Sequence, residues 1–232
     1  MARLFDDGSS EYLEIDSAVV SNWPLTISAW VYSDSATADQ AVLMVGNKGS
    51  SVKMHFLYLA GTQPSAPVRM ASITAGTPAF ASTSSGYSAN TWHHVAGSVT
   101  AADARSAWID GGSKGTNSDS EDPGAFADRT SIGRLGDLTP GFYFSGRIAE
   151  IAVWNVGLTD TDVANLALGH SPLSIVPESL VAYWQLIESN GDIDYLNDFN
   201  LTAFNTPSWA AHPSGIMYPV RRPAIFQIPA IF

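Results

Sequence analysis

The segment LTISAWVYS at residues 25–33 constrains the fold more than any other part of the chain. Its residues alternate between two sets, namely Leu25, Ile27, Ala29 and Val31, and Thr26, Ser28, Trp30 and Tyr32. A period of two with β-branched and aromatic residues is typical of a β-strand, because successive side chains point to opposite faces. The segment therefore predicts a central strand covered on both faces.

Most of the chain shows a similar strand-like pattern. Further strands are predicted within 41–50, 52–60, 68–74, 90–115, 130–158, 178–189 and 201–205. Asp110-Gly111-Gly112 separates two alternating segments and predicts a hairpin, because Gly accepts the positive φ of a tight turn. The last strand of 130–158 is predicted to place Ile148, Glu150, Ala152 and Trp154 on one face and Ala149, Ile151 and Val153 on the other.

A single helix is predicted at residues 159–169. Thr159 is its expected N-cap, Asp162 the expected partner in a capping box, and Gly169 its expected end. Many strands, short turns and one helix together predict an all-β protein, an antiparallel two-sheet jelly-roll sandwich.

Composition narrows the classes of partner. The 232 residues include 45% hydrophobic residues, which is enough for one large β domain, and 11 Lys and Arg against 22 Asp and Glu give a net charge of −11. Binding to nucleic acid or to an anionic membrane needs clustered positive charge, so neither partner is expected. The absence of cysteine excludes disulfides and thiolate chemistry.

Four segments in order resemble the concanavalin A-like lectin/glucanase superfamily, in its laminin-G-like and pentraxin-like branch. They are FDDGSSEYLEI at 5–15, LTISAWV at 25–31, the hairpin at 91–111 and the segment at 132–163. The resemblance implies a laminin-G-like domain over residues 1–215, with its core at 5–168 and C-terminal strands at 178–205. Residues 179–219 look like a continuation found on laminin-G-like proteins of phage and bacterial genomes, which implies a virion-associated protein.

The superfamily includes glycoside hydrolases, whose laminarinase-type members carry a Glu-x-Asp-x-x-Glu strand. Here Glu14 and Asp16 match, but Val19 stands at the third position, so the acid/base that hydrolysis needs is missing. The expectation is therefore a protein that is not an enzyme. His93 and His94 are adjacent on a strand and would face opposite sides, which excludes a shared ligand sphere.

No cofactor is required by the sequence, and calcium is an open alternative. Loop carboxylates and amides are suitable calcium ligands, and two clusters offer them: Asp6 and Asp7, and Glu188, Asn190, Asp192 and Asp194. Neither cluster has the fixed spacing of a known calcium loop, so solvated acidic loops are the other interpretation.

Aromatic residues in loops are the candidates for glycan binding, because sugar rings stack on exposed aromatic faces. The candidates are Tyr87, Phe126, Phe142 and Tyr143. Five tryptophans lie instead in predicted strands and are expected to pack in the core: Trp30, Trp92, Trp108, Trp154 and Trp184.

The end of the chain, 216–232, is predicted to be an extended apolar tail because its prolines disfavour helix and central strand. Its candidate partner-binding residues are Arg221, Arg222, Ile225, Phe226, Ile228, Ile231 and Phe232. The first hypothesis is a non-catalytic assembly protein, a phage capsid decoration or tail accessory protein. The tail would anchor it to other subunits, either capsid or tail proteins or copies of itself.

The alternative hypothesis is a carbohydrate-binding lectin-like module, with surface glycans as partners and calcium as an optional ligand. A glycoside hydrolase is a remote third. The expected location is the virion surface if the protein is phage-encoded. Otherwise it is the cytoplasm or release without a signal peptide, since no apolar signal region opens the sequence.

Overall fold

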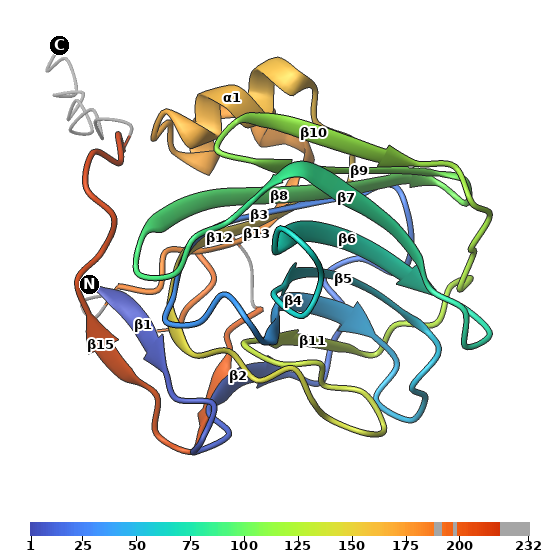
Figure 1. The fold of residues 1–232 in the computed structure, drawn as a ribbon, viewed down its shortest axis with the longest axis horizontal. Helices are drawn as coiled ribbons and strands as arrows, with labels where there is room; N and C mark the ends of the chain where they lie inside the picture. The colour runs from blue at the N-terminus through green and yellow to red at the C-terminus, as the bar shows by residue number, and fades with distance from the viewer. Residues whose placement is uncertain (188–191, 197–198, 219–232) are drawn as a thin grey trace, which may run out of the picture.

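The computed structural model describes residues 1–187, 192–196 and 199–218, which form a sandwich of two antiparallel β-sheets (Figure 1). The eight-stranded sheet contains, in spatial order, β10 (Gly112–Asn117), β9 (Ala104–Ile109), β8 (Trp92–Ala101), β3 (Leu25–Ser33), β12 (Gly146–Trp154), β1 (Ala2–Phe5) and β15 (Ser208–Ala210), with β13 (Leu180–Trp184) also paired to β12. The seven-stranded sheet contains β14 (Thr202–Phe204), β2 (Tyr12–Ile15), β11 (Arg129–Ile132), β4 (Asp39–Gly46), β5 (Met54–Ala60), β6 (Pro67–Ile73) and β7 (Ala79–Gly86). The predicted two-sheet jelly-roll sandwich is confirmed.

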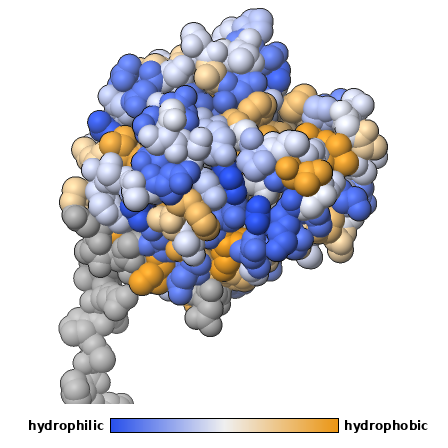
Figure 2. All heavy atoms as spheres, turned by 90° about the horizontal axis from the view of Figure 1, so that it is seen from below, coloured by the Kyte–Doolittle hydropathy of each residue, from blue (hydrophilic) through white to orange (hydrophobic). Residues whose placement is uncertain are grey.

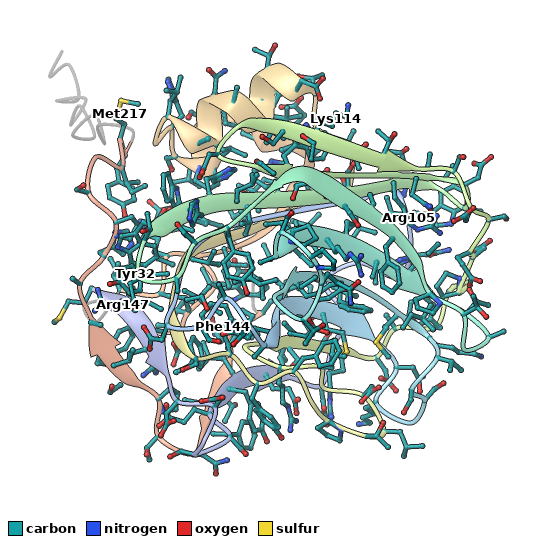
Figure 3. All side chains as sticks on the ribbon, viewed as in Figure 1. Tyr32, Arg105, Lys114, Phe144, Arg147 and Met217 are labelled. Carbon is teal, nitrogen blue, oxygen red and sulfur yellow. The ribbon has the colours of Figure 1, made fainter. Side chains whose placement is uncertain are left out.

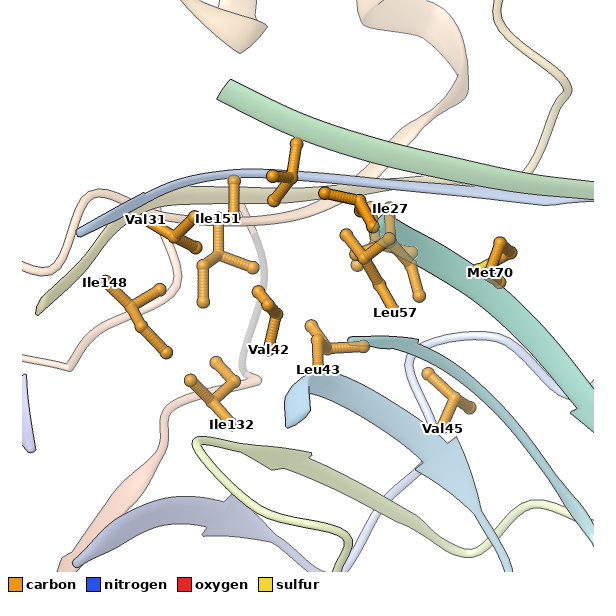
Figure 4. Packing of buried hydrophobic residues seen from close by; sticks show 14 of the residues in the cluster. Ile27, Val31, Val42, Leu43, Val45, Leu57, Met70, Ile132, Ile148 and Ile151 are labelled. Carbon is orange, nitrogen blue, oxygen red and sulfur yellow. The ribbon is translucent and has the colours of Figure 1, made fainter. Parts of the chain in front are cut away.

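The core lies between the two sheets. In Figure 4, Ile27, Val31, Ile148 and Ile151 of the eight-stranded sheet face Val42, Leu43 and Ile132 of the seven-stranded sheet. The first set of residues in β3, predicted from its alternation, is this inner face, and Leu25, Ile27 and Ala29 are fully buried. Burial of this apolar surface supplies the main stabilisation of the sandwich.

The helix α1 (Asp160–Ala167) lies over the outer face of the eight-stranded sheet, at the top of Figure 1. Thr159 and Asp162 form the predicted capping box, in which each side chain accepts from the backbone of the other. Two 3-10 turns, η1 (Pro172–Ser174) and η2 (Pro177–Ser179), connect α1 to β13. No helix in the described ranges is long and apolar enough to cross a membrane.

The predicted faces of β12 are wrong at Ile148, which does not share a face with Ala152 and Trp154. A β-bulge interrupts its pairing with β3 between Ala149 and Ala152, and Glu150 has a positive φ of 54°. The extra residue shifts the alternation, so that Ile148 and Ile151 both face the inter-sheet core. Glu150 itself is only 2% exposed.

The C-terminal strap, residues 211–218, continues from β15 across the outer face of the eight-stranded sheet toward α1. Met217 donates from its backbone to the Gly169 carbonyl (2.7 Å) and accepts from the Ser171 amide (3.2 Å). The candidate partner-binding residues of the tail, 219–232, lie outside the described residues. The predicted boundary at residue 215 stays a prediction.

The outer face of the seven-stranded sheet carries a second apolar cluster. Leu57 and Leu59 of β5 belong to the inter-sheet core, whereas Phe56 and Tyr58 point outward, where Leu135 of the β11–β12 connection packs on them. Figure 2 shows the side of the molecule on which β2 lies, with hydrophobic patches separated by hydrophilic residues. The β11–β12 connection thus positions loop side chains against this sheet.

Candidate functional site

An open pocket lies at the end of the sandwich where four loops meet. It has a volume of about 460 Å³ and is lined by Asp7, Thr37, Ala38, Asp39, Thr62, Phe142 and Tyr143. Two of the four predicted glycan-binding aromatics, Phe142 and Tyr143, are brought together here with Asp7 of a predicted calcium cluster.

Phe142 forms the apolar wall of this pocket. The residue is 38% exposed, and its ring stacks on Tyr58 with 5.8 Å between ring centroids. Its backbone has a φ of 53° and accepts from the Ala41 amide at 2.8 Å. A bulky side chain held in the left-handed region carries strain, which is common where a residue serves a ligand.

Tyr143 is held by aromatic and cationic neighbours. Its ring lies 6.5 Å from Tyr12, which stacks on Phe204 at 4.7 Å. The Arg134 guanidinium covers Tyr12 at 3.4 Å from the ring centroid. Phe204 and Arg134 thus hold Tyr12, whose ring lies behind Tyr143.

Polar groups line the opposite wall. Asp39 Oδ1 accepts hydrogen bonds from the Thr62 amide (3.1 Å) and hydroxyl (2.8 Å). Asp39 lines the pocket, and within the described part of the chain its Oδ2 has no hydrogen-bond partner, so this oxygen is free to accept from a ligand. A few oriented polar groups beside an aromatic face are what a sugar-binding site requires.

The other predicted glycan-binding residues are elsewhere. Tyr87 is 6% exposed, belongs to the core and donates to the Ser35 carbonyl, and burial raises its pKa to about 12. Phe126 is half-buried at the opposite end of β4, where it packs edge-on against His55 at 5.7 Å. Neither residue lines the pocket.

The hydrolase carboxylates are tied into ion pairs. Glu14 is buried and pairs with Arg134 at 2.6 Å, and Asp16 pairs with Arg129 at 2.8 Å and with Lys48 at 3.0 Å. Hydrogen bonds from Arg129 and Lys48 lower the pKa of Asp16. A pKa raised toward neutrality is what a general acid needs, and the ion pairs of Asp16 act in the opposite direction.

The calcium candidates do not converge among the described residues. Asp6 closes its own turn by accepting from Gly8 and Ser9, Asp192 pairs with Arg3, and Asp194 accepts from the Tyr183 amide at 2.9 Å. No group of three or more potential metal ligands occurs in the ranges that the structure describes. Glu188 and Asn190 lie outside those ranges, and calcium binding there stays a prediction.

Two of the five strand tryptophans are not in the core. Trp154, Trp184 and Trp108 are buried as predicted, whereas Trp30 and Trp92 are half-buried on the outer face of the eight-stranded sheet. Alternation alone cannot show which face of a strand a neighbouring sheet covers, which is why the prediction failed for these two.

A larger hollow of about 770 Å³ borders β13, lined among others by Val181, Leu196 and Phe199. Asp194 and the 36% exposed Tyr195 also line it, but it adjoins segments outside the described residues. It is therefore not taken as the site.

The sequence profile of the concanavalin A-like lectin/glucanases superfamily matches residues 7–164, more than half of the chain. The chain belongs to this superfamily. A search of curated protein sequences finds no match.

Solved structures with a similar fold include a heptameric SAP-like pentraxin from Limulus polyphemus. It has 12% sequence identity and a TM-score of 0.62, and the match covers 88% of this chain and 90% of that one. A putative carbohydrate-binding protein from Bacteroides ovatus has 20% identity and a TM-score of 0.62, with 87% of this chain and 57% of that one covered. The CBM40 module of a Ruminococcus gnavus IT-sialidase, bound to α2,3-sialyllactose, has 16% identity and a TM-score of 0.58, with coverage of 72% and 96%. These similarities show the shared fold.

Sequence reasoning did not single out Thr37, Asp39 or Thr62 as site residues. All three lie in connections between predicted strands, where polar residues are common and carry no specific signal. Only the packing of loops from distant parts of the chain places them around Phe142.

Proposed function

We propose that this superfamily member is a non-catalytic carbohydrate-binding module that holds a sugar in the pocket between Phe142 and Asp39. The observation that carries the proposal is the exposed Phe142 ring beside an open pocket with an unpaired carboxylate oxygen. One sugar face would stack on the ring, while its hydroxyls would donate to Asp39. Solved structures with this fold include proteins described as carbohydrate-binding, which supports the proposed carbohydrate binding.

A role in catalysis has no support in this geometry. Glu14 and Asp16 are engaged by arginine and lysine side chains, and the third position of the hydrolase pattern is Val19, which is buried. A bound glycan would accordingly be released without being cleaved.

The phage virion role receives no support from the comparisons, and the tail residues on which it depends lie outside the described ranges. Anchoring through the tail therefore stays a separate prediction. It does not depend on the glycan-binding pocket.

A glycan array tests the proposal, run on the full chain with calcium and with a chelator. Phe142→Ala is expected to lose at least tenfold in affinity for any glycan bound, because the stacking face is removed. Leu138→Ala is the matched control, since Leu138 is 63% exposed in the same loop but does not line the pocket. An array without signal in both conditions, or equal losses in the two variants, would contradict the proposal.

A further inference from the structure

A row of three side chains crosses the outer face of the eight-stranded sheet near the end that carries the pocket. Arg147 of β12 is the register partner of Tyr32 in β3, and Tyr32 is the register partner of Trp92 in β8. The Arg147 guanidinium carbon lies 4.4 Å from the Tyr32 ring centroid, and the Tyr32 and Trp92 centroids are 5.7 Å apart. Figure 3 shows Arg147 and Tyr32 together at one side of the molecule.

Arg147 lacks a polar partner, unlike the other arginines of the described chain. Arg3, Arg129 and Arg134 pair with carboxylates, Arg105 donates to backbone carbonyls, and Arg69 donates to neighbouring side chains. Arg147 forms neither a hydrogen bond nor an ion pair with any described residue, and its Nε is buried without an acceptor. The two terminal guanidinium nitrogens are not buried in this way and have no partner among the described residues, so a ligand carboxylate would supply the acceptor that Arg147 lacks.

Its two neighbours also keep unused donors. The Trp92 indole N–H and the Tyr32 hydroxyl have no hydrogen-bond partner among the described residues, whereas the indole N–H groups of Trp108, Trp154 and Trp184 all do. The three half-buried side chains therefore present a cation, a hydroxyl and an indole N–H, together with aromatic surface.

The surrounding charges favour a single carboxylate at this place. Glu150 of β12 is 2% exposed and accepts from Tyr183 and Tyr218. Asp34 is exposed beyond the end of β3, and Asp110 is paired with His93 at 2.8 Å. None of these three carboxylates forms an ion pair with Arg147, and the chain as a whole carries a charge of −11. An acidic ligand would approach a negative protein, so it needs a cation that is not already neutralised.

We propose that Arg147, Tyr32 and Trp92 form a subsite for a carboxylated sugar. The guanidinium would hold the carboxylate in a bidentate pair, and the sugar ring would lie against the aromatic side chains. The inference rests on the proposed glycan-binding function and adds to it a preference for acidic over neutral sugars, at a place separate from the Phe142 pocket.

Titration of the full chain with D-glucuronate tests the subsite, with the Arg147 Nε–H and Trp92 indole N–H signals followed by NMR. D-glucose and acetate, at equal concentration, supply the ring without the charge and the charge without the ring. Glucuronate is expected to shift both signals saturably and the two controls to shift them at least tenfold more weakly. Arg147→Met should abolish binding, and Arg147→Lys should weaken it at least fivefold, because an ammonium cannot form the planar bidentate pair.

Lys114→Gln is the matched control, because Lys114 also lies over an aromatic ring, Trp108 at 5.0 Å, but is already paired with Asp160. It should leave glucuronate binding unchanged.

Three outcomes separate this inference from the proposed function. NMR signals that do not move with glucuronate, while the array detects binding of neutral glycans, overturn this inference and do not affect the proposed function. An array without signal, together with saturable glucuronate binding at Arg147, contradicts glycan binding at the Phe142 pocket instead. Acetate binding as tightly as glucuronate, or a dimer that Arg147→Met dissociates, would show that the cation serves another carboxylate and overturns the subsite.

Discussion

The Tyr218 hydroxyl donates a 2.6 Å hydrogen bond to Oε1 of Glu150, a residue 68 positions earlier in the chain. Glu150 also accepts from the Tyr183 hydroxyl, and His212 Nε2 lies 3.0 Å from its Oε1. Burial and the negative charge of Glu150 raise the pKa of both tyrosines, so they remain protonated donors. The carboxylate at the bulge of β12 thus fastens the C-terminal strap to the sheet.

Removing one of these donors should loosen the strap. Tyr218→Phe is expected to destabilise the protein by about 1 kcal/mol, since Tyr218 is 42% exposed and water can replace its hydroxyl in part. Hydrogen exchange of residues 211–218 should quicken. Met217→Leu, at a position 49% exposed, is the control, and equal exchange in both variants would refute the fastening role of Tyr218.

Two buried histidines should make the protein sensitive to acid. Burial lowers the pKa of His94 to about 4, and burial together with Arg105 lowers that of His55 to about 3. Below the ordinary value of 6.5 the unfolded chain binds protons that the folded chain does not, so stability falls as pH decreases from 6.5 toward 4. Each histidine contributes up to about 1.4 kcal/mol per pH unit.

Urea denaturation at pH 7, 6 and 5 measures this slope. His94→Gln should reduce it by about one proton, and His170→Gln, at an exposed position, should not change it. A free energy of unfolding that is constant from pH 7 to pH 5 would be inconsistent with two neutral buried imidazoles.

Substitution of Arg105 should destabilise the protein more than most other single substitutions in the chain. It is 2% exposed and donates to the carbonyls of Ala102, Asp119 and Glu121 at 2.7–2.8 Å and to the Ser72 hydroxyl at 2.8 Å. Arg105→Met leaves these acceptors unpaired and is expected to destabilise the protein by roughly 2–4 kcal/mol. Thermal unfolding measures the loss. Arg69→Met, at a half-exposed site, should have a clearly smaller effect, and the reverse order would contradict this account.

Gly115 should not tolerate a side chain. A Cβ there would lie 1.6 Å from the Ser82 carbonyl oxygen, because β10 and β7 approach closely at the edge of the sandwich. Gly115→Ala is expected to destabilise by about 1–3 kcal/mol through overpacking. Gly112→Ala in the same strand meets no atom within 4 Å and should change stability by less than about 0.5 kcal/mol. Equal midpoints of urea unfolding for the two variants would show that β10 can move away from β7 without loss of stability.

Much of the fold could be predicted from local pattern. The alternation in LTISAWVYS coincides with β3, and the capping box of Thr159 and Asp162 marks the start of α1. These features depend on residues close in the sequence, whose periodicity and hydrogen bonding are local. The bulge at Glu150 could not be read in the same way, because the pattern of β12 is regular and the bulge arises from pairing with β3.

An antiparallel β-sandwich with one capped helix could be predicted from local patterns alone, as could the position of Phe142 and Tyr143 in a loop. Long-range packing instead brings these two together with Asp39 in one pocket, buries Tyr87, and places Tyr32 between Trp92 and Arg147 on an outer face. The physical reason is that a strand's alternation fixes which side chains share a face. Whether that face meets another sheet, a loop or solvent depends on contacts between segments far apart in the chain.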